Sequence, residues 1–377
     1  MDDRSRKLDG RMASLDLLRL VAALSVVGFH YLFRGAAPEP FLDAGYPAAA
    51  PFAIFGYLGV NLFFLISGFV IAWSAEGRTW RDFAIARFAR LYPGYLACMS
   101  ASFIVLAVAR DPRLPADVSA YLANLLMFAP ALHRPFMDGV YWSIVLEIVF
   151  YGWIALLLMT GLFRRHRLQV IAAWLLITAA NEFVLKSGAL RLALLTEYAP
   201  FFAGGMLAQH IVTKGRSVEA MVLAVAAFLL SCDTLTVTQV WMQAHYGVSL
   251  SLAQLLGANI VIHALFVGAV LLRRRIAPTG FILLLGGLTY PLYLLHQNIG
   301  YLALNALAPH LGRWPALALV TAAMLAAALF VCRFVEMPAR KPLIRVLTGL
   351  FDGASRRLAP MPLQKSLRIT RRQMAAE

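Results

Sequence analysis

Long apolar runs alternate with short polar segments along almost the whole chain. Ten runs are long enough to approach the roughly 20 residues that a helix needs to cross a bilayer. A further apolar stretch at 119–131 is shorter and ends in Ala-Pro-Ala, so we expect an interfacial or re-entrant segment there. The pattern predicts an all-α protein, a polytopic bundle of about ten transmembrane helices. The runs lie near 15–33, 53–74, 91–109, 141–162, 168–185, 195–212, 217–232, 251–272, 281–306 and 314–334.

Composition agrees with this pattern. Of the 377 residues 61% are hydrophobic and only 14% are charged, whereas an average soluble domain is about half apolar and about a quarter charged. These values exclude a soluble globular enzyme, a disordered chain and a coiled coil. We expect a membrane domain over 1–342 and a basic cytoplasmic tail over 343–377, with the lipid bilayer as a partner.

Positive charge is distributed unevenly between the two sides of the predicted bundle. If 119–131 does not span, 25 Lys and Arg residues lie on one side and seven on the other, and basic residues mark the cytoplasmic side. Both termini are then cytoplasmic. The net charge of +15 is thus explained by topology, and we expect no nucleic-acid partner.

Ionisable residues inside apolar helices are costly and mark candidate sites. In the first run Arg19 and His30 are eleven residues apart, which places both on one helix face about 16 Å apart. Asp16 lies one turn before Arg19 and can pair with it. The structural alternative is an interfacial Asp–Arg pair and a histidine bonded to a backbone carbonyl.

Glu147 and His296 are ionisable residues inside two other apolar runs, the fourth and the ninth. A carboxylate in an apolar helix needs a partner or transfers protons. Counted from the ends of their runs, His30, His296 and Glu147 all lie about 21–22 Å from the cytoplasmic surface. The three helices are therefore predicted to bring them to one level.

Arg87 and Arg90 lie three residues apart at the cytoplasmic start of the third run and share a helix face. Arginine forks suit phosphates, although an ordinary positive-inside pair explains this spacing as well. In the second run Ser67 and Gly68 fit close helix packing, and Asn61 is placed to bond across helices.

The three cysteines form no metal-ligand or disulfide spacing. We therefore expect no metal site and no permanently bound cofactor.

Six motifs occur together and in order. They are Leu15-Asp16 with Arg19 and then His30; Gly59-Val60-Asn61-Leu62-Phe63-Phe64 with Ser67-Gly68-Phe69; Arg87-x-x-Arg90-Leu91-Tyr92-Pro93; Trp142-Ser143 with Glu147 and Phe150-Tyr151; Tyr290-Pro291-Leu292-Tyr293-Leu294-Leu295-His296; and Phe334-Val335-Glu336-Met337-Pro338-Ala339-Arg340. Over residues 14–342 the chain thereby resembles integral-membrane acyltransferase family 3, the family of O-antigen, exopolysaccharide and Nod-factor O-acetylases.

The resemblance implies an O-acyltransferase of the bacterial inner membrane. It implies that an acyl group, usually acetyl, passes from cytosolic acyl-CoA to a hydroxyl of an envelope or secreted glycan or its lipid-linked precursor. His30 corresponds to the catalytic histidine. Donor binding is implied for Arg19, Arg87 and Arg90, and roles for Glu147 and Glu336.

The resemblance also indicates substrate contacts for four further motif residues, which are Asn61, Ser67, Tyr293 and His296. Asn61 stands where many relatives have Asp.

Many relatives add an extracytoplasmic hydrolase-like domain. We expect this chain to lack one and to transfer the acyl group directly or to a separate partner.

His30 has two possible mechanisms, as general base on the acceptor hydroxyl or as nucleophile that forms an acyl-imidazole. A carboxylate such as Glu147 is one candidate to fix its tautomer. The acceptor stays open between lipopolysaccharide, secreted polysaccharide, lipid-linked sugar and a small hydrophobic natural product, and homo-oligomers are possible.

The competing class is a transporter or flippase for a lipid-linked or acylated small molecule, in which the same charges form a translocation route. The sequence shows no inverted repeat, which favours the acyltransferase. Binding of coenzyme A discriminates between the two.

Overall fold

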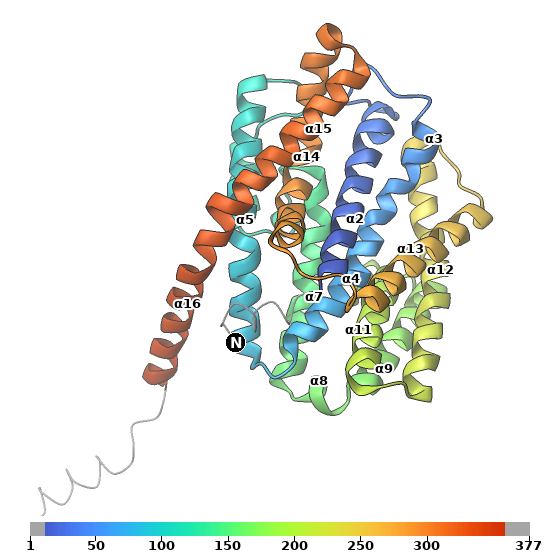
Figure 1. Ribbon diagram of the computed structural model, residues 1–377, viewed down its shortest axis with the longest axis vertical. Helices are drawn as coiled ribbons and strands as arrows, with labels where there is room; N and C mark the ends of the chain where they lie inside the picture. Colours follow the sequence, from blue (N-terminus) through green and yellow to red (C-terminus); the bar gives the residue numbers. More distant parts are fainter. Residues whose placement is uncertain (1–11, 359–377) are drawn as a thin grey trace, which may run out of the picture.

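The computed structural model describes residues 12–358 and side chains as far as 353. Within this range the chain is helical and contains no strand. Figure 1 shows the long helices packed side by side into one bundle. The predicted basic residues of 1–11 and the end of the basic tail, 359–377, lie outside the described residues.

The long helices are α2 (Ala13–Leu32), α4 (Gly59–Ala75), α5 (Trp80–Ala109), α7 (Trp142–Met159), α9 (Arg167–Ala180), α11 (Ala199–Lys214), α12 (Val218–Tyr246), α13 (Leu252–Leu272), α14 (Gly280–Leu311), α15 (Arg313–Phe330) and α16 (Met337–Leu358). Short α-helices connect them: α3 (Ala50–Ala53), α6 (Val118–Asn124), α8 (Leu162–Arg165) and α10 (Gly188–Leu194). The remaining turns are the 3-10 helices η1 (Arg34–Ala36), η2 (Ile54–Leu58), η3 (Ala129–Leu132) and η4 (Gly139–Tyr141), and the π-helices η5 (Asn181–Leu185) and η6 (Val331–Glu336).

Eight helical stretches of the described chain are long and apolar enough to cross a membrane. The prediction of a multi-pass, all-helical protein is confirmed. The other two predicted runs correspond to α11, which has 16 residues, and to α14, which has 32 residues and carries polar side chains near its middle. The total of ten spans and the cytoplasmic placement of the termini stay predictions.

The short apolar stretch at 119–131 does not form a long helix. It contains the seven-residue helix α6, capped by Asp117, and the 3-10 turn η3. A helix rises about 1.5 Å per residue, so neither element can cross a bilayer. This agrees with the expected interfacial or re-entrant segment.

Helix α5 is longer than its apolar run predicts. It begins at Trp80, eleven residues before the predicted run, because the side chain of Thr79 caps it by accepting a hydrogen bond from the amide of Asp82. The helix also continues through Pro93. As a result Arg87 and Arg90 stand on a helix rather than at its entrance.

The last helices form one continuous rod. The predicted run 314–334 is followed without a break by η6 and α16, which leads away from the bundle (Figure 1). Arg81 of α5 holds α16 through the carbonyl of Thr348, at 3.4 Å, and through an ion pair with Asp352. The predicted domain boundary at 342/343 lies inside this helix, and the division into two domains stays a prediction.

Small residues allow two helices at the centre of the bundle to pack closely. A Cβ atom at Gly68 of α4 would lie 2.1 Å from the carbonyl oxygen of Phe202 in α11, and one at Gly205 would lie 2.1 Å from that of Leu65. The packing interpretation of Gly68 is therefore confirmed.

Candidate active site

A cavity of about 930 Å³ lies between α2, α4, α5, α7, α14 and η6. One end is lined by Met12 and Gly280, where α2 and α14 begin, and the other by Val60, Ser143 and Tyr293. The first end is the one at which the basic loops lie, which the charge distribution assigns to the cytoplasm.

Charged side chains are concentrated in this cavity. Five arginines and three acidic residues line it, although it is built within the membrane part of the bundle. The five are Arg19, Arg87, Arg90, Arg333 and Arg340, and the three are Asp16, Glu147 and Glu336. Seven of the ten predicted site residues are lining residues: Arg19, Ser67, Arg87, Arg90, Glu147, Tyr293 and Glu336.

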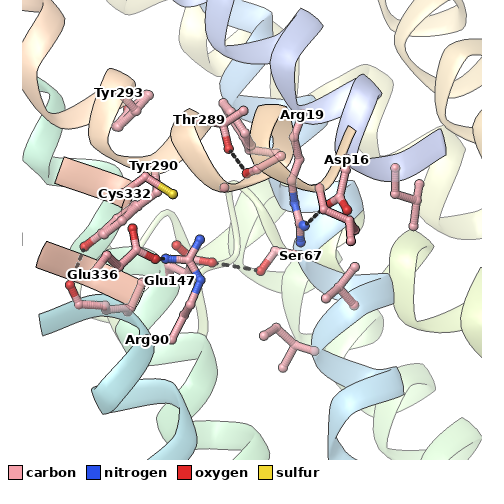
Figure 2. A pocket seen from close by; sticks show the side chains of 18 of the residues that line it. Asp16, Arg19, Ser67, Arg90, Glu147, Thr289, Tyr290, Tyr293, Cys332 and Glu336 are labelled. Atoms are coloured by element: carbon pink, nitrogen blue, oxygen red, sulfur yellow. Dashed lines mark hydrogen bonds and ion pairs between the residues drawn. The ribbon is translucent and has the colours of Figure 1, made fainter. Parts of the chain in front are cut away.

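Arg19 is paired with Asp16, as the spacing predicts. The guanidinium Nη1 lies 3.0 Å from Oδ1 of Asp16, and Figure 2 shows this pair on one side of the cavity. Gly286 of α14 faces the pair, since a Cβ there would lie 2.6 Å from Asp16. The glycine thus lets α14 approach the charged turn of α2.

Arg90 is also paired, but with a residue far from it along the chain that no sequence pattern connects with it. Its guanidinium forms an ion pair with Glu336 of η6 (Figure 2). Oε2 of Glu336 is buried and has no hydrogen-bond partner in the described chain. The ring of Tyr290 stacks 5.4 Å from the guanidinium carbon of Arg90.

Arg87 differs from these two arginines. Within residues 12–353 no carboxylate lies close enough to form an ion pair with it, and its buried Nε lacks a hydrogen-bond partner. Its guanidinium carbon lies 5.9 Å from the ring of Phe83. Of the three predicted donor-binding arginines, Arg87 is therefore the one without an ion-pair partner in this part of the chain.

Glu147 accepts hydrogen bonds from Ser67, at 3.2 Å, and from the hydroxyl of Tyr151 one helical turn away. Ser67 thus has a polar partner in addition to its packing role. The described chain shows no hydrogen bond between Glu147 and His30 or His296. Glu147 therefore does not orient His30 in this structure, because its side chain faces the cavity instead.

His30 and His296 contact each other directly. Nδ1 of His30 lies 3.0 Å from Nε2 of His296, and the two rings meet edge to face with centroids 4.9 Å apart. His296 is fully buried. Neither histidine lines the cavity; they lie beyond the end closed by Tyr293, whose ring centroid is 5.8 Å from that of His296.

The Tyr293 end of the cavity carries two hydroxyl groups. The hydroxyl of Tyr293 lies 2.7 Å from Oγ of Ser143, and each is 3.2 Å from the carbonyl oxygen of Val140. A ligand that fills the cavity from its basic end therefore meets two hydroxyls directly before the histidine pair.

Sequence reasoning missed the residues that hold the turn of α14 around His296. Tyr31 donates a hydrogen bond of 2.6 Å to the carbonyl of His296, and Asp138 accepts one of 3.0 Å from the amide of Asn298. Both side chains are fully buried. An aspartate three residues before the fourth apolar run was the available signal for Asp138, whereas Tyr31 had none.

Asn61, like the two histidines, is a predicted site residue that does not line the cavity. It is buried in α4 and is not a lining residue. Its substrate contact stays a prediction. The three cysteines form no disulfide within the described residues, and Cys332 lines the cavity.

Comparison with known families now identifies the class. The family model for an acyltransferase domain, acyltransferase family 3, matches residues 12–333, so the chain belongs to this family of membrane acyltransferases. The resemblance seen in the motifs is confirmed.

Two curated proteins are similar over part of the chain. "Acyltransferase MdmB" of Streptomyces mycarofaciens is 31% identical over 153 residues, which are 37% of this chain and 38% of that protein. "Protein 2 in picA locus" of Rhizobium radiobacter is 35% identical over 163 residues, 37% of this chain and 78% of that protein. No solved structure matches the chain.

Proposed function

We propose that the protein is an acyl-CoA-dependent O-acyltransferase of the bacterial inner membrane. In this proposal it transfers an acyl group, by resemblance acetyl, to a hydroxyl of an envelope or secreted glycan or of its lipid-linked precursor. The observation that carries the proposal is a cavity that opens toward the basic end of the bundle and is lined by Arg87, whose guanidinium has no ion-pair partner among the described residues.

The cavity suits a donor that is anionic at one end. A volume of about 930 Å³ lies near the top of the roughly 300–1,000 Å³ that ligand pockets have. Coenzyme A carries several phosphates, and guanidinium groups bind phosphate in charge-assisted hydrogen bonds. With the phosphates near Arg87, the flexible arm of the donor extends toward Tyr293 and Ser143.

His30 then performs the chemistry in one of two ways. As general base it removes the proton of the acceptor hydroxyl, whose oxygen attacks the thioester carbonyl while the carbon–sulfur bond breaks. As nucleophile it first forms an acyl-imidazole, which the hydroxyl then cleaves. In both cases the thiolate of coenzyme A leaves and takes up a proton.

Support for the acceptor comes from the family alone. The resemblance to O-antigen, exopolysaccharide and Nod-factor O-acetylases favours a glycan hydroxyl.

Binding of labelled acetyl-CoA to the purified protein tests the donor site. A charge-assisted hydrogen bond contributes about 1.5–3 kcal/mol, so Arg87→Ala is expected to raise Kd roughly 10- to 150-fold. Arg165→Ala, which removes the same charge from an exposed position outside the cavity, is the matched control and should bind as wild type does.

Equal affinity in the Arg87→Ala and Arg165→Ala variants contradicts the phosphate role of the cavity. Absence of coenzyme A binding by wild-type protein contradicts the donor itself and favours the alternative function, a transporter or flippase for a lipid-linked or acylated small molecule.

A further inference from the structure

The hydrogen bonds of the two histidines determine where their protons lie. A carbonyl oxygen only accepts hydrogen bonds, so a ring nitrogen bonded to one must carry the proton. Nδ1 of His296 lies 2.9 Å from the carbonyl oxygen of Tyr293 and 3.1 Å from that of Leu292. His296 therefore has its proton on Nδ1 and, as a neutral ring, a lone pair on Nε2.

His30 follows the same pattern. Its Nδ1 lies 2.9 Å from the carbonyl oxygen of Val26 and 3.0 Å from Nε2 of His296. Both neighbours are acceptors, so this nitrogen carries the proton and shares it between them. The lone pair of His30 is then on Nε2, for which the described chain shows no hydrogen bond.

We propose that His296 is a positioning residue: its Nε2 accepts the Nδ1–H of His30 and thereby keeps the basic nitrogen, Nε2 of His30, free for the reaction. This inference rests on the proposed function for the reaction that His30 performs. It gives to a neutral histidine the orienting task for which the sequence suggested a carboxylate such as Glu147.

The fold holds His296 firmly enough for this task. The hydroxyl of Tyr31, from the helix that carries His30, donates to the carbonyl of His296 at 2.6 Å, and Asp138 binds the amide of Asn298 at 3.0 Å. Gly300 lets the two helices approach, since a Cβ there would lie 2.0 Å from the Tyr31 hydroxyl. The distance between the two rings is thus set by contacts on both sides of His296.

Proton balance explains why a neutral acceptor suffices. When Nε2 of His30 removes the proton of the acceptor hydroxyl, the ring becomes an imidazolium, and its Nδ1–H becomes a stronger donor to His296. The proton then passes from Nε2 of His30 to the thiolate leaving group. His296 keeps its own proton on Nδ1, where it is hydrogen-bonded to the backbone carbonyls, throughout the reaction and contacts neither substrate.

Two substitutions at one position test the inference. His296→Leu removes the acceptor, whereas His296→Gln places an amide oxygen three bonds from Cβ, as Nε2 is in histidine. General base catalysis contributes about 10²–10⁴-fold, and we expect the leucine variant to lose roughly 10- to 100-fold of this in kcat for release of the coenzyme A thiol. The KM for acetyl-CoA should not change, and the glutamine variant should stay within about fivefold of wild type.

His263→Leu is the matched control. Its Nδ1 bonds a backbone carbonyl, that of Asn259 at 2.9 Å, in the same way, but its ring contacts Phe201 and Phe228 rather than a second histidine. This variant should keep the kcat of wild type.

The tautomer of His30 is read directly, without turnover, from the ¹⁵N chemical shifts of its ring in labelled protein in bilayers. The inference expects the proton on Nδ1 in wild type and in His296→Gln, and a mixture of tautomers in His296→Leu. Wild-type kcat in the leucine variant, a glutamine variant as slow as the leucine one, or a wild-type proton on Nε2 of His30 would each overturn it. Loss of the proposed function alone would show as an absence of acetyl-CoA turnover with the tautomers as expected.

Discussion

Gly300→Ala tests whether the contact between α2 and α14 at the histidine pair is as close as the structure has it. The added Cβ would lie 2.0 Å from the hydroxyl oxygen of Tyr31, 2.4 Å from its Cζ and 2.5 Å from its Cε1. Tyr31 is 0% exposed, so its ring has no space into which to move. Either the two helices separate or Tyr31 leaves the carbonyl of His296.

The magnitude follows from three contributions. Overpacking of a filled core costs about 1–3 kcal/mol, and loss of the buried hydrogen bond from Tyr31 to His296 costs about 0.5–1.5 kcal/mol. The higher helix propensity of alanine returns about 1 kcal/mol. The net destabilisation is therefore about 1–3 kcal/mol.

Thermal unfolding of the detergent-solubilised protein measures this effect, with Gly28→Ala as control. Gly28 lies in the same helix as Tyr31, and a Cβ there meets no atom within 4 Å. We expect Gly300→Ala to lower the Tm and Gly28→Ala to leave it unchanged or raise it. Equal Tm values for the two variants would refute the close contact between the helices.

Three further predictions concern other contacts. Arg90→Gln leaves the carboxylate of Glu336 buried without its ion-pair partner, which costs about 3–5 kcal/mol. The double variant with Glu336→Gln should therefore be more stable than the sum of the single changes predicts. Simple additivity in thermal unfolding would contradict the ion pair between the two residues. Gly205→Ala pushes a Cβ against a backbone oxygen of α4, and we expect reduced yield of folded protein; normal yield and Tm would contradict the crossing. In the loop that follows α5, Arg113 donates hydrogen bonds to the carboxylate of Asp111 and thereby lowers the pKa of that carboxyl. The stabilisation of the fold by this pair is therefore complete above about pH 4 and is lost as the pH falls through the lowered pKa. Because the pair is near the surface, it amounts to less than about 1 kcal/mol. Arg113→Ala should remove this acid dependence from the curve of unfolding free energy against pH.

Features that depend on nearby residues were predictable from the sequence. The apolar runs locate the long helices because burial in lipid requires them to be apolar, and the pair Asp16–Arg19 follows from helical spacing. The shared face of Arg87 and Arg90 follows in the same way, and both line the cavity.

Contacts between distant helices were not predictable in the same way. Depth arithmetic placed His30, His296 and Glu147 at one level, but depth does not fix the rotation of a helix about its axis. The two histidines meet, whereas Glu147 faces Ser67 and the cavity.

Two departures from the predicted helices have a related cause. The apolar runs stop at charged residues, but the helices need not stop there. Helix α5 therefore begins before its run, which brings Arg87 and Arg90 into the bundle, and the last helix continues through η6 into α16. The partner of Arg90, Glu336, lies in that continuation.

We expect transfer from an acyl-CoA to require His30. This requirement is tested most directly by following release of the coenzyme A thiol from labelled acetyl-CoA by purified protein, with water or an added envelope glycan as acceptor, in wild type and His30→Ala. Wild type and the Arg165→Ala control should release the thiol, whereas a folded His30→Ala variant that still binds the donor should release none. Release by His30→Ala at the wild-type rate would contradict it.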